Sequence, residues 1–549
     1  MNVEWPQWTT ELTADQVTGE DQLGVESAAQ GYQQFLVPGI ITTTDHARYY
    51  SFYSWVLYRF INDPDSSRLL KDFRGPYFKR HEAALIAASY GHHPELGAYP
   101  GLVGRGSAEK IWNSGDPLSL DVTYFKHTLG GFGQYYRSAM QAMGLVAESE
   151  HPRWVYRLTH RGEALAQAFE ASIADTAYFQ ALQDGELATL SREEAIEYGQ
   201  HSCICPEALA SGQDLEPLRD AFFRLDQTGI ENPHVRRRLT LGVVLDLVHN
   251  TTGEPVQDLI RPALYLGEYR DGLAYTPDTR LLPWVTRWRM VQIRQFYTFG
   301  LQCLWASFLL RLRADNEGLT FEDYLGWVAG QLPDGLAAKP SATYLDSLGR
   351  AAGLSSGWRD ASTHFDEACR QAMECDEYTL YKQARDNRRD AQVLLTCGLQ
   401  MLAQLFLRFL LRHLNEDSLW QELATKQRLP MACYFNGMLE RLNDPGWTVS
   451  DWLEWLYRDF IIGQHEFIAL EKLRYQRYDT FKFHYRDGYF YWPFSLSRDY
   501  REPIRLAALR LFNALTILID LGLVESDGTR LTEDGLAYRM RVLEMDNGA

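Results

Sequence analysis

Positively charged and aromatic residues are interleaved through the segment 472–486, which reads Lys-Leu-Arg-Tyr-Gln-Arg-Tyr-Asp-Thr-Phe-Lys-Phe-His-Tyr-Arg. Cationic side chains neutralise phosphate groups, and exposed rings stack on nucleic-acid bases. The chemistry that these residue types offer is therefore the binding of a nucleic acid. The side chains predicted to make such contacts are Lys472, Arg474, Arg477, Lys482, His484 and Arg486.

Toward its C-terminal end this segment alternates as a β-strand does and runs into an Asp-Gly pair, which favours a tight turn. In such a strand Lys482, His484 and Arg486 share one face, and Phe483 and Tyr485 lie on the other. The same pattern also suits a half-buried hairpin whose basic face meets only solvent. Both interpretations stay open at this point.

A second group of residues has the types that bind metals. His201, Cys203 and Cys205 stand at alternating positions, but a structural zinc site needs four ligands. Further candidates such as His234 and His249 are distant in the sequence. The sequence leaves metal binding here open and favours small buried thiols at a turn between two helices. Neither a metal nor a cofactor is therefore predicted.

The sequence offers no recognisable catalytic constellation. A phosphate-binding Walker A loop and an H-E-x-x-H zinc motif are both absent. The segment 353–357, Gly-Leu-Ser-Ser-Gly, has the spacing of a nucleophile elbow, but a helical pattern precedes it where that motif needs a strand. We therefore expect a protein without enzymatic activity. An enzyme whose site is assembled from distant residues is the alternative.

The charge of the whole chain limits what a basic surface can do. The 549 residues include 54 Lys and Arg against 72 Asp and Glu, a formal net charge of −18. Only a local basic patch is compatible with nucleic-acid binding by so acidic a protein. Seven scattered cysteines indicate a reducing compartment, and no signal-peptide pattern is present. We expect a cytoplasmic protein that does not enter a membrane.

The elements that position these residues are predicted to be mostly helical. Helical spacing predicts long helices over 283–314 and 377–415, which should form the spine of a central bundle. The predicted fold class is mainly α, a multi-domain helical protein with two winged-helix-like modules flanking a central helical bundle. The predicted domains are an aromatic-rich helical region at 1–75, a winged-helix-like domain at 76–175, a central helical domain at 176–465, and a basic hairpin with a C-terminal winged-helix-like module at 466–549.

The two modules are predicted from an order of elements that occurs twice. In the first, a helix over 124–143 is followed by Gly-Leu-Val, a hairpin and a helix capped by Thr159. In the second, a helix over 501–521 is followed by Gly-Leu-Val, a hairpin with an Asp-Gly tip and a helix after Thr532. This order is typical of the end of a winged helix. Acidic residues in both hairpins repel phosphates, so the modules suit protein docking as well as DNA binding.

Arginines elsewhere in the chain are assigned structural or solvated roles. Residues 39–60 begin with a Thr/Asp cap and then concentrate aromatic rings in a helix with Arg48 and Arg59. These two arginines are predicted to bridge the aromatic helix to a neighbouring element. The three consecutive arginines at 236–238 are predicted to lie on a solvated face at the start of a helix.

The opening signature GYQQFLVPGIITTTDHARYYSFYSWVLYRF, at residues 31–60, resembles a group of prokaryotic proteins that begin with a similar Pro-Gly…Ala-Arg-Tyr…Phe…Trp helix. A later stretch, HEFIALEKL…DTFKF between His465 and Phe483, is also similar to that group. Such proteins are encoded beside helicases, phospholipase-D-type nucleases and other phage-defence genes. The resemblance implies an accessory subunit of an antiviral system and supplies no catalytic residue.

Together these observations predict a non-enzymatic accessory subunit of a bacterial antiviral defence system. It is expected to bind DNA or RNA, or a nucleic-acid-processing partner such as a helicase or a phospholipase-D-type nuclease, and no membrane. An alternative from another class is a purely structural winged-helix adaptor, similar to subunits of chromosome-organising complexes.

Overall fold

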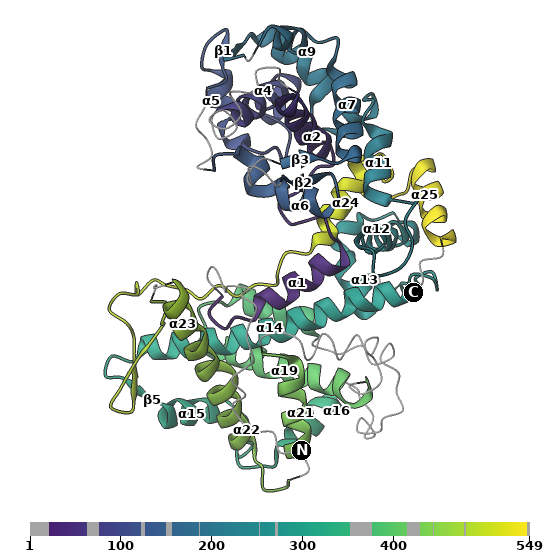
Figure 1. Cartoon of the computed structure of the whole chain (residues 1–549). Helices are drawn as coiled ribbons and strands as arrows, with labels where there is room; N and C mark the ends of the chain where they lie inside the picture. The colour runs from purple at the N-terminus through teal and green to yellow at the C-terminus, as the bar shows by residue number, and fades with distance from the viewer. Residues whose placement is uncertain are drawn as a thin grey trace. The chain divides into compact units, whose positions relative to one another are not determined.

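The computed structural model describes residues 21–62, 76–121, 127–149, 156–185, 187–251, 253–269, 273–351, 376–413, 429–442, 444–476 and 479–545. The fold is mainly helical, as predicted (Figure 1). The chain divides into two compact units. Unit 1 comprises Met1–Gly31 and Arg289–Ala507, and unit 2 comprises Tyr32–Trp288 and Ala508–Ala549. Each unit is thus made from two separate stretches of chain, whereas each of the predicted domains is one continuous segment.

Unit 2 is organised around the aromatic helix α2 (Arg48–Ile61), which packs against α7 (His160–Ile173). Beside this pair, α4 (Tyr77–His92) packs against α9 (Arg192–Ser202), and Figure 1 draws these helices in purple and blue. Further helices described in this unit are α5 (Ala108–Trp112), α6 (Arg137–Ala142), α8 (Ala177–Ala181), α10 (Pro206–Ala210), α11 (Leu215–Phe223), α12 (Pro233–Asn250), α13 (Ile260–Leu266), α24 (Arg510–Asp520) and α25 (Glu533–Glu544).

The rings of α2 are buried, and their polar tips are satisfied. Tyr53 donates a hydrogen bond of 2.9 Å to Glu82, and the Tyr49 hydroxyl accepts one of 2.7 Å from the Val103 amide. Buried Tyr side chains need such partners because an unpaired hydroxyl in the core costs free energy. The prediction that the preceding Thr and Asp residues cap this helix is wrong, because no such side chain caps it. Asp520 of α24 takes that place, and its carboxylate accepts from the Ala47 amide at 2.9 Å.

Two segments of unit 2 repeat one hydrogen-bonded motif, as the sequence predicted. In the first, α6 leads to the antiparallel pair β2 (Val146–Glu148) and β3 (Tyr156–Leu158), and Thr159 caps α7 by accepting from the Gly162 amide. In the second, α24 leads to a bridge between Val524 and Leu531, and Thr532 caps α25 by accepting from the Gly535 amide.

The details of the two motifs also agree. The hydroxyl of each capping threonine donates a 2.7 Å hydrogen bond to the carbonyl of the glycine that ends the preceding helix, Gly144 or Gly522. Both glycines have positive φ, 70° and 67°, where L side chains are strained. The first helix of the second motif is shorter than expected, because α24 begins only at Arg510.

Gly162 and Gly535 bring their helices close enough to the preceding chain that no side chain fits. A Cβ atom at Gly162 would lie 2.2 Å from the Leu145 carbonyl oxygen, and one at Gly535 would lie 1.9 Å from that of Leu523. We expect Gly162→Ala and Gly535→Ala each to destabilise unit 2 by about 2–3 kcal/mol in urea unfolding. Gly106→Ala is the matched control, since a Cβ there meets nothing within 4 Å. Equal stability of all three variants would contradict the close approach.

Unit 1 is built on the helix α14 (Leu282–Ala314), and the boundary between the two units, after Trp288, falls within this helix. Its bounds agree with the predicted helix over 283–314 to within one residue. The expected helix over 377–415 is two helices, α18 (Glu377–Asp386) and α19 (Ala391–His413). Further helices described here are α15 (Phe321–Gly330), α16 (Ser341–Ala351), α21 (Met431–Leu442), α22 (Val449–Trp455) and α23 (Gly463–Gln476). Within the described ranges, no helix combines the length and apolar character that crossing a membrane requires.

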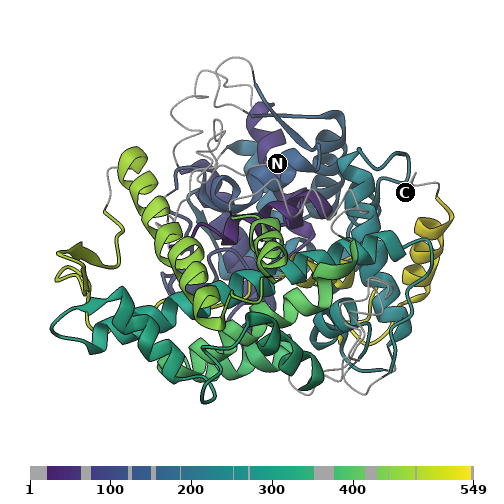
Figure 2. The same cartoon turned by 90° about the horizontal axis from the view of Figure 1, so that it is seen from below.

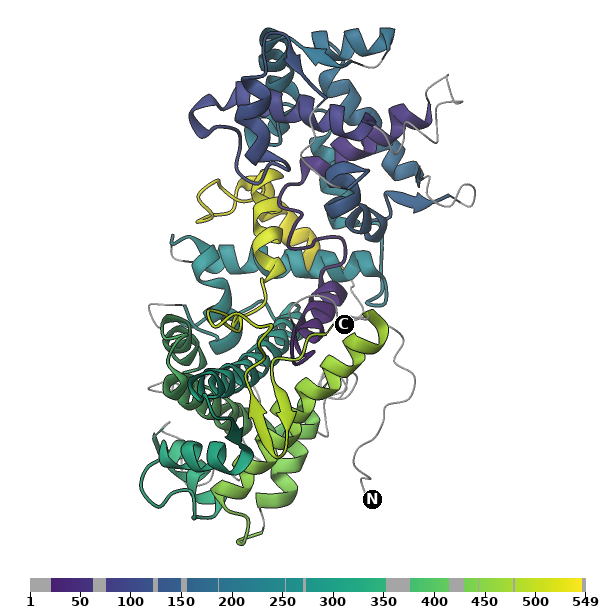
Figure 3. The same ribbon diagram turned by 90° about the vertical axis from the view of Figure 1, so that its left-hand side faces the viewer.

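A small sheet completes unit 1 and includes the predicted hairpin. Strands β6 (His484–Arg486) and β7 (Tyr489–Tyr491) pair antiparallel, and their arrows face the viewer in Figure 3. The turn residues Asp487 and Gly488 both have positive φ, as a tight hairpin turn of this kind requires. β7 also pairs with β5 (Leu319–Thr320), which the sequence analysis did not identify.

Candidate nucleic-acid interface

The residues predicted to bind nucleic acid do not all reach the surface. Lys472 lies inside unit 1 with 2% of its surface exposed, and its Nζ donates to the Asp21 carbonyl at 2.8 Å. Its interpretation as a surface cation is therefore wrong, because a buried ammonium cannot meet a phosphate. Arg474 is exposed near the end of α23, and Arg477 lies outside the described residues. A nucleic-acid role for the other predicted residues stays a prediction.

The hairpin β6–β7 projects at the margin of unit 1 (Figure 2). Its cations and most of its rings are exposed or half-buried. His484 and Arg486 are exposed, and the Arg486 guanidinium pairs with Asp487 at 3.0 Å in an open ion pair. Such exposed pairs contribute little free energy, so Asp487 does not withdraw Arg486 from a ligand. Phe483 is buried, whereas Tyr485, predicted on the same strand face, is 60% exposed.

Lys482 connects this hairpin to a second group of cations. Its Nζ lies 4.5 Å from the centroid of the Tyr500 ring, and the Tyr500 hydroxyl donates to Glu502 at 2.5 Å. The Tyr500 carbonyl in turn accepts hydrogen bonds from Arg313, at the end of α14, and from Arg501. A chain of contacts thus runs from the predicted Lys482 to two arginines that the sequence analysis did not select.

These arginines belong to a larger set, which we call the arginine cluster. Arg313, Arg388 and Arg501 line one hollow together with Trp492 and Tyr500. The pKa of Arg313 is lowered by burial first and then by the nearby positive charges of Arg501 and Arg389. The members of the cluster are Arg313, Arg388, Arg389, Arg498 and Arg501.

Several guanidinium groups of the cluster have no fixed countercharge. Among the described residues, Arg388, Arg389 and Arg501 have no carboxylate within ion-pair distance, and the first two are exposed. Burial raises the pKa of Glu502, which also lines the hollow, to about 7, so this carboxyl is only partly ionised at neutral pH. Asp386 and Asp390 lie on either side of Arg388 and Arg389, and Asp499 acts on Arg313, so the positive charge is compensated in part. The charge that remains favours the binding of an anion.

Three aromatic rings are exposed in the hairpin and in the loop that follows it. Phe494 is fully exposed at 105% of its reference surface, in the loop between the hairpin and Arg498. Tyr485 and Tyr489 of the hairpin are 60% and 40% exposed. Guanidinium groups with open aromatic faces are the combination that single-stranded nucleic acids need, since phosphates and unpaired bases are then both contacted.

The sequence contains only a weak signal for this cluster. Arg388 and Arg389 are adjacent in the turn between α18 and α19, whereas Arg313 and Arg501 come from a helix end and a loop far away in the chain. The elements that unite them are the α14 end and the 498–501 loop, joined by a 3.1 Å hydrogen bond from Arg313 to the Arg498 carbonyl. No local pattern predicts that contact.

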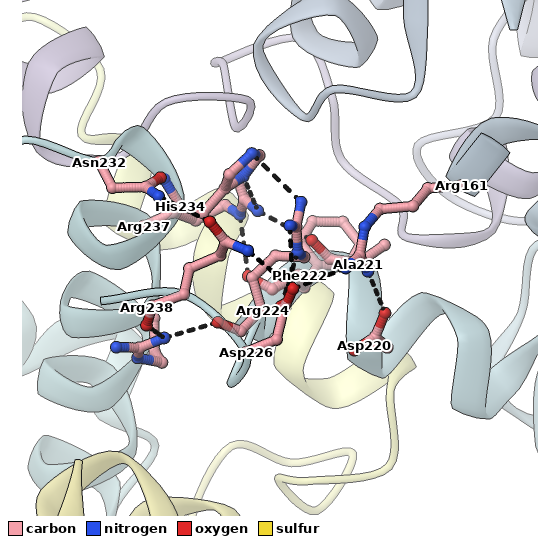
Figure 4. A network of polar contacts seen from close by, with 11 residues as sticks. Arg161, Asp220, Ala221, Phe222, Arg224, Asp226, Asn232, His234, Arg237 and Arg238 are labelled. Carbon is pink, nitrogen blue, oxygen red and sulfur yellow. Dashed lines mark hydrogen bonds and ion pairs between the residues drawn. The ribbon is translucent and has the colours of Figure 1, made fainter. Parts of the chain in front are cut away.

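The prediction that the arginines at 236–238 lie on a solvated face is wrong for two of them. Arg237 and Arg238 are fully buried, so they do not lie on a solvated face. The Arg237 guanidinium donates to the carbonyls of Ala221 and Phe222 at the end of α11, at 2.8 and 2.9 Å (Figure 4). Helix ends leave carbonyls without intrahelical partners, and this guanidinium satisfies them. These residues hold unit 2 together and are not available to a ligand.

The structural role predicted for the arginines of α2 is confirmed. The Arg48 guanidinium makes a two-point ion pair with Asp214 at 3.1 and 3.2 Å, and Arg59 donates to the Leu182 carbonyl at 2.9 Å. The thiols of Cys203 and Cys205 are buried at the turn between α9 and α10, as predicted, while His201 is exposed. The segment 353–357 lies outside the described residues.

Comparison of this chain with protein-family models, with curated proteins and with solved structures finds no match. Functional assignment therefore rests on the residues and their geometry.

Proposed function

We propose that this protein is a non-enzymatic accessory subunit of a bacterial antiviral defence system that binds single-stranded nucleic acid through unit 1. The observation that carries the binding role is the arginine cluster, in which Arg388, Arg389 and Arg501 have no carboxylate within ion-pair distance among the described residues. Exposed rings of the hairpin and of the loop after it belong to the same unit. The defence setting is supported by the resemblance of the opening signature. The predicted Lys482, His484 and Arg486 extend the cationic surface onto the hairpin.

The test is a titration of a labelled single-stranded oligonucleotide with the full chain, followed by fluorescence anisotropy over a series of salt concentrations. Binding through phosphates gives an affinity that falls steeply with salt. The double variant Arg388→Gln/Arg389→Gln should lower the affinity about tenfold and reduce the salt slope by about 1.4, since each phosphate contact to a single strand contributes about 0.7. Phe494→Ala should weaken binding by about 1–3 kcal/mol if a base stacks on this ring.

The matched control is Arg157→Gln/Arg530→Gln, which removes one exposed arginine from each of the repeated helix–hairpin–helix motifs. Its affinity should equal that of the wild type. Loss of binding in this control, with the Arg388/Arg389 variant unaffected, would move the interface to unit 2. Absence of any salt-dependent binding would refute the proposal.

One observation favours the structural-adaptor alternative for the repeated motifs themselves. The hairpin of the second motif is held against the body of unit 2, because the Val256 amide donates to the Gly528 carbonyl at 3.1 Å and the Thr251 hydroxyl to that of Thr529 at 3.2 Å. A DNA-reading wing must be free to enter a groove. We propose that this motif serves the architecture of unit 2 and that nucleic acid is bound elsewhere.

A further inference from the structure

Two histidines and a cysteine that are remote in the sequence meet in unit 2. His92 is the last residue of α4, His93 follows it, and Cys205 precedes α10. The ligand atoms, one imidazole nitrogen from each histidine and the Cys205 Sγ, all lie within 4.8 Å of one another. The packing of α4 against α9, and of α9 against α10, brings them together.

The environment of this cluster suits a metal ion better than a hydrogen-bonded core. The His93 side chain is only 14% exposed, its Nε2 makes no hydrogen bond of ordinary geometry among the described residues, and its ring interacts with the Cys205 thiol. A buried polar nitrogen without a partner costs free energy, and a metal ion would satisfy it. The other ring nitrogen, Nδ1, lies 3.7 Å from the Glu95 carboxylate, the kind of outer partner that orients metal-bound histidines.

We propose that His92, His93 and Cys205 bind one divalent transition-metal ion of the zinc type. Imidazole nitrogens and a thiolate are the donors that such ions prefer over the oxygen ligands of Mg²⁺ and Ca²⁺. With three protein ligands, a tetrahedral ion keeps one position for a further donor. On binding, the Cys205 thiol loses its proton to solvent and the sulfur–metal bond forms, with no change in oxidation state.

The site lies where the C-terminal end of α4 and the N-terminal end of α10 come together. An ion bound here joins the end of α4 to the start of α10, so it stabilises unit 2 in the folded state. The histidine nearest to the cysteines in sequence, His201, is exposed and is not part of the cluster. It therefore serves as the matched control.

The experiment uses the full chain, freed of metal with a chelator and titrated with Zn²⁺ and, separately, Co²⁺. We expect one equivalent to bind, an upward shift of the melting temperature with Zn²⁺, and thiolate-to-cobalt charge-transfer absorption with Co²⁺. His92→Ala, His93→Ala and Cys205→Ala should each weaken Zn²⁺ binding at least about 100-fold, since changes in outer partners alone cost 10- to 100-fold. His201→Ala should bind as the wild type does.

The His92→Ala variant guards against misfolding as an explanation, because His92 is only partly buried. Its melting temperature without metal should match that of the metal-free wild type, and it should not rise with Zn²⁺. A wild-type chain without the cobalt–thiolate absorption, or a His92→Ala variant that retains wild-type Zn²⁺ affinity, would overturn the proposal. So would loss of binding in His201→Ala with the three ligand variants unaffected.

Discussion

Replacing Asp214 by Ala is expected to destabilise unit 2 by about 3–5 kcal/mol, because it leaves the Arg48 guanidinium as a buried charge without its partner. Both side chains are completely buried. The Asp214 carboxylate also accepts hydrogen bonds from Ser51 at 2.6 Å and from Ser172 at 3.0 Å, and its loss leaves these hydroxyls only the carbonyls of their own helices as acceptors. Amide hydrogen exchange of α2 measures this change within unit 2 alone.

The matched control is the exposed ion pair between Arg80 and Asp121, whose 2.7 Å contact is as short but lies at the surface. Asp121→Ala should cost less than about 1 kcal/mol, because water replaces the partner. The double variant Arg48→Met/Asp214→Leu should recover much of the loss of Asp214→Ala, since it removes both buried charges. If Asp214→Ala lowered the stability no more than Asp121→Ala, the buried ion pair would not be the interaction that holds α2 to the N-terminal end of α11.

Replacing Arg237 by Met is expected to destabilise unit 2 by about 2–4 kcal/mol, the cost of leaving two to three buried carbonyls without a donor. Besides Ala221 and Phe222, its guanidinium donates to the Pro38 carbonyl at 3.2 Å. Burial lowers the pKa of Arg237 to about 9, which shows that desolvation of the charge offsets part of this gain. The expected loss of unfolding free energy is therefore smaller than the summed free energies of the hydrogen bonds that are removed.

The neighbouring Arg236 provides the control, because its guanidinium lies 4.2 Å from the centroid of the Phe35 ring and remains partly exposed. Arg236→Met should cost no more than about 1 kcal/mol, the value of an exposed cation–π contact. Arg237→Lys should fall close to Arg237→Met, since a single ammonium cannot reach carbonyls on both sides as a planar guanidinium does. Full rescue by lysine in urea unfolding would contradict this account.

The long, regular elements could be predicted from the sequence because their periodicity is local. α14 and the hairpin β6–β7 follow directly from helical spacing and from an Asp-Gly turn between alternating residues. The threonine cap at Thr159 and the helix that follows Thr532 were predicted for the same reason. A capping residue and its helix are neighbours in the chain, so no distant contact is needed to identify them.

Errors in the helix bounds have physical causes that are visible in the structure. The expected helix over 377–415 is interrupted because Asp390 accepts from the Gln392 and Val393 amides and so starts a new helix. The expected helix over 501–521 starts late, at Arg510, where the Gln33 side chain bonds both the Ala508 carbonyl and the Arg510 amide. The Asp that begins a helix was present as a local signal, whereas the contact with Gln33 was not.

The candidate sites could not be predicted in the same way. Lys472 lies in a cationic run, yet its ammonium is buried against the Asp21 carbonyl, a contact across most of the chain. The arginine cluster and the His92/His93/Cys205 group each combine residues from separate elements. Adjacent residue types identify the chemistry that a segment offers, but only the fold determines which distant side chains share a surface.

The interleaving of the two units has a consequence for synthesis. The stretch Ala508–Ala549, which supplies Asp520 to the start of α2 and Thr532 to α25, is translated after the whole of Arg289–Ala507. During translation, Tyr32–Trp288 therefore leaves the ribosome before Asp520 has been made. Until then, the Ala47 amide and the His46 ring lack the carboxylate that binds them in the folded unit.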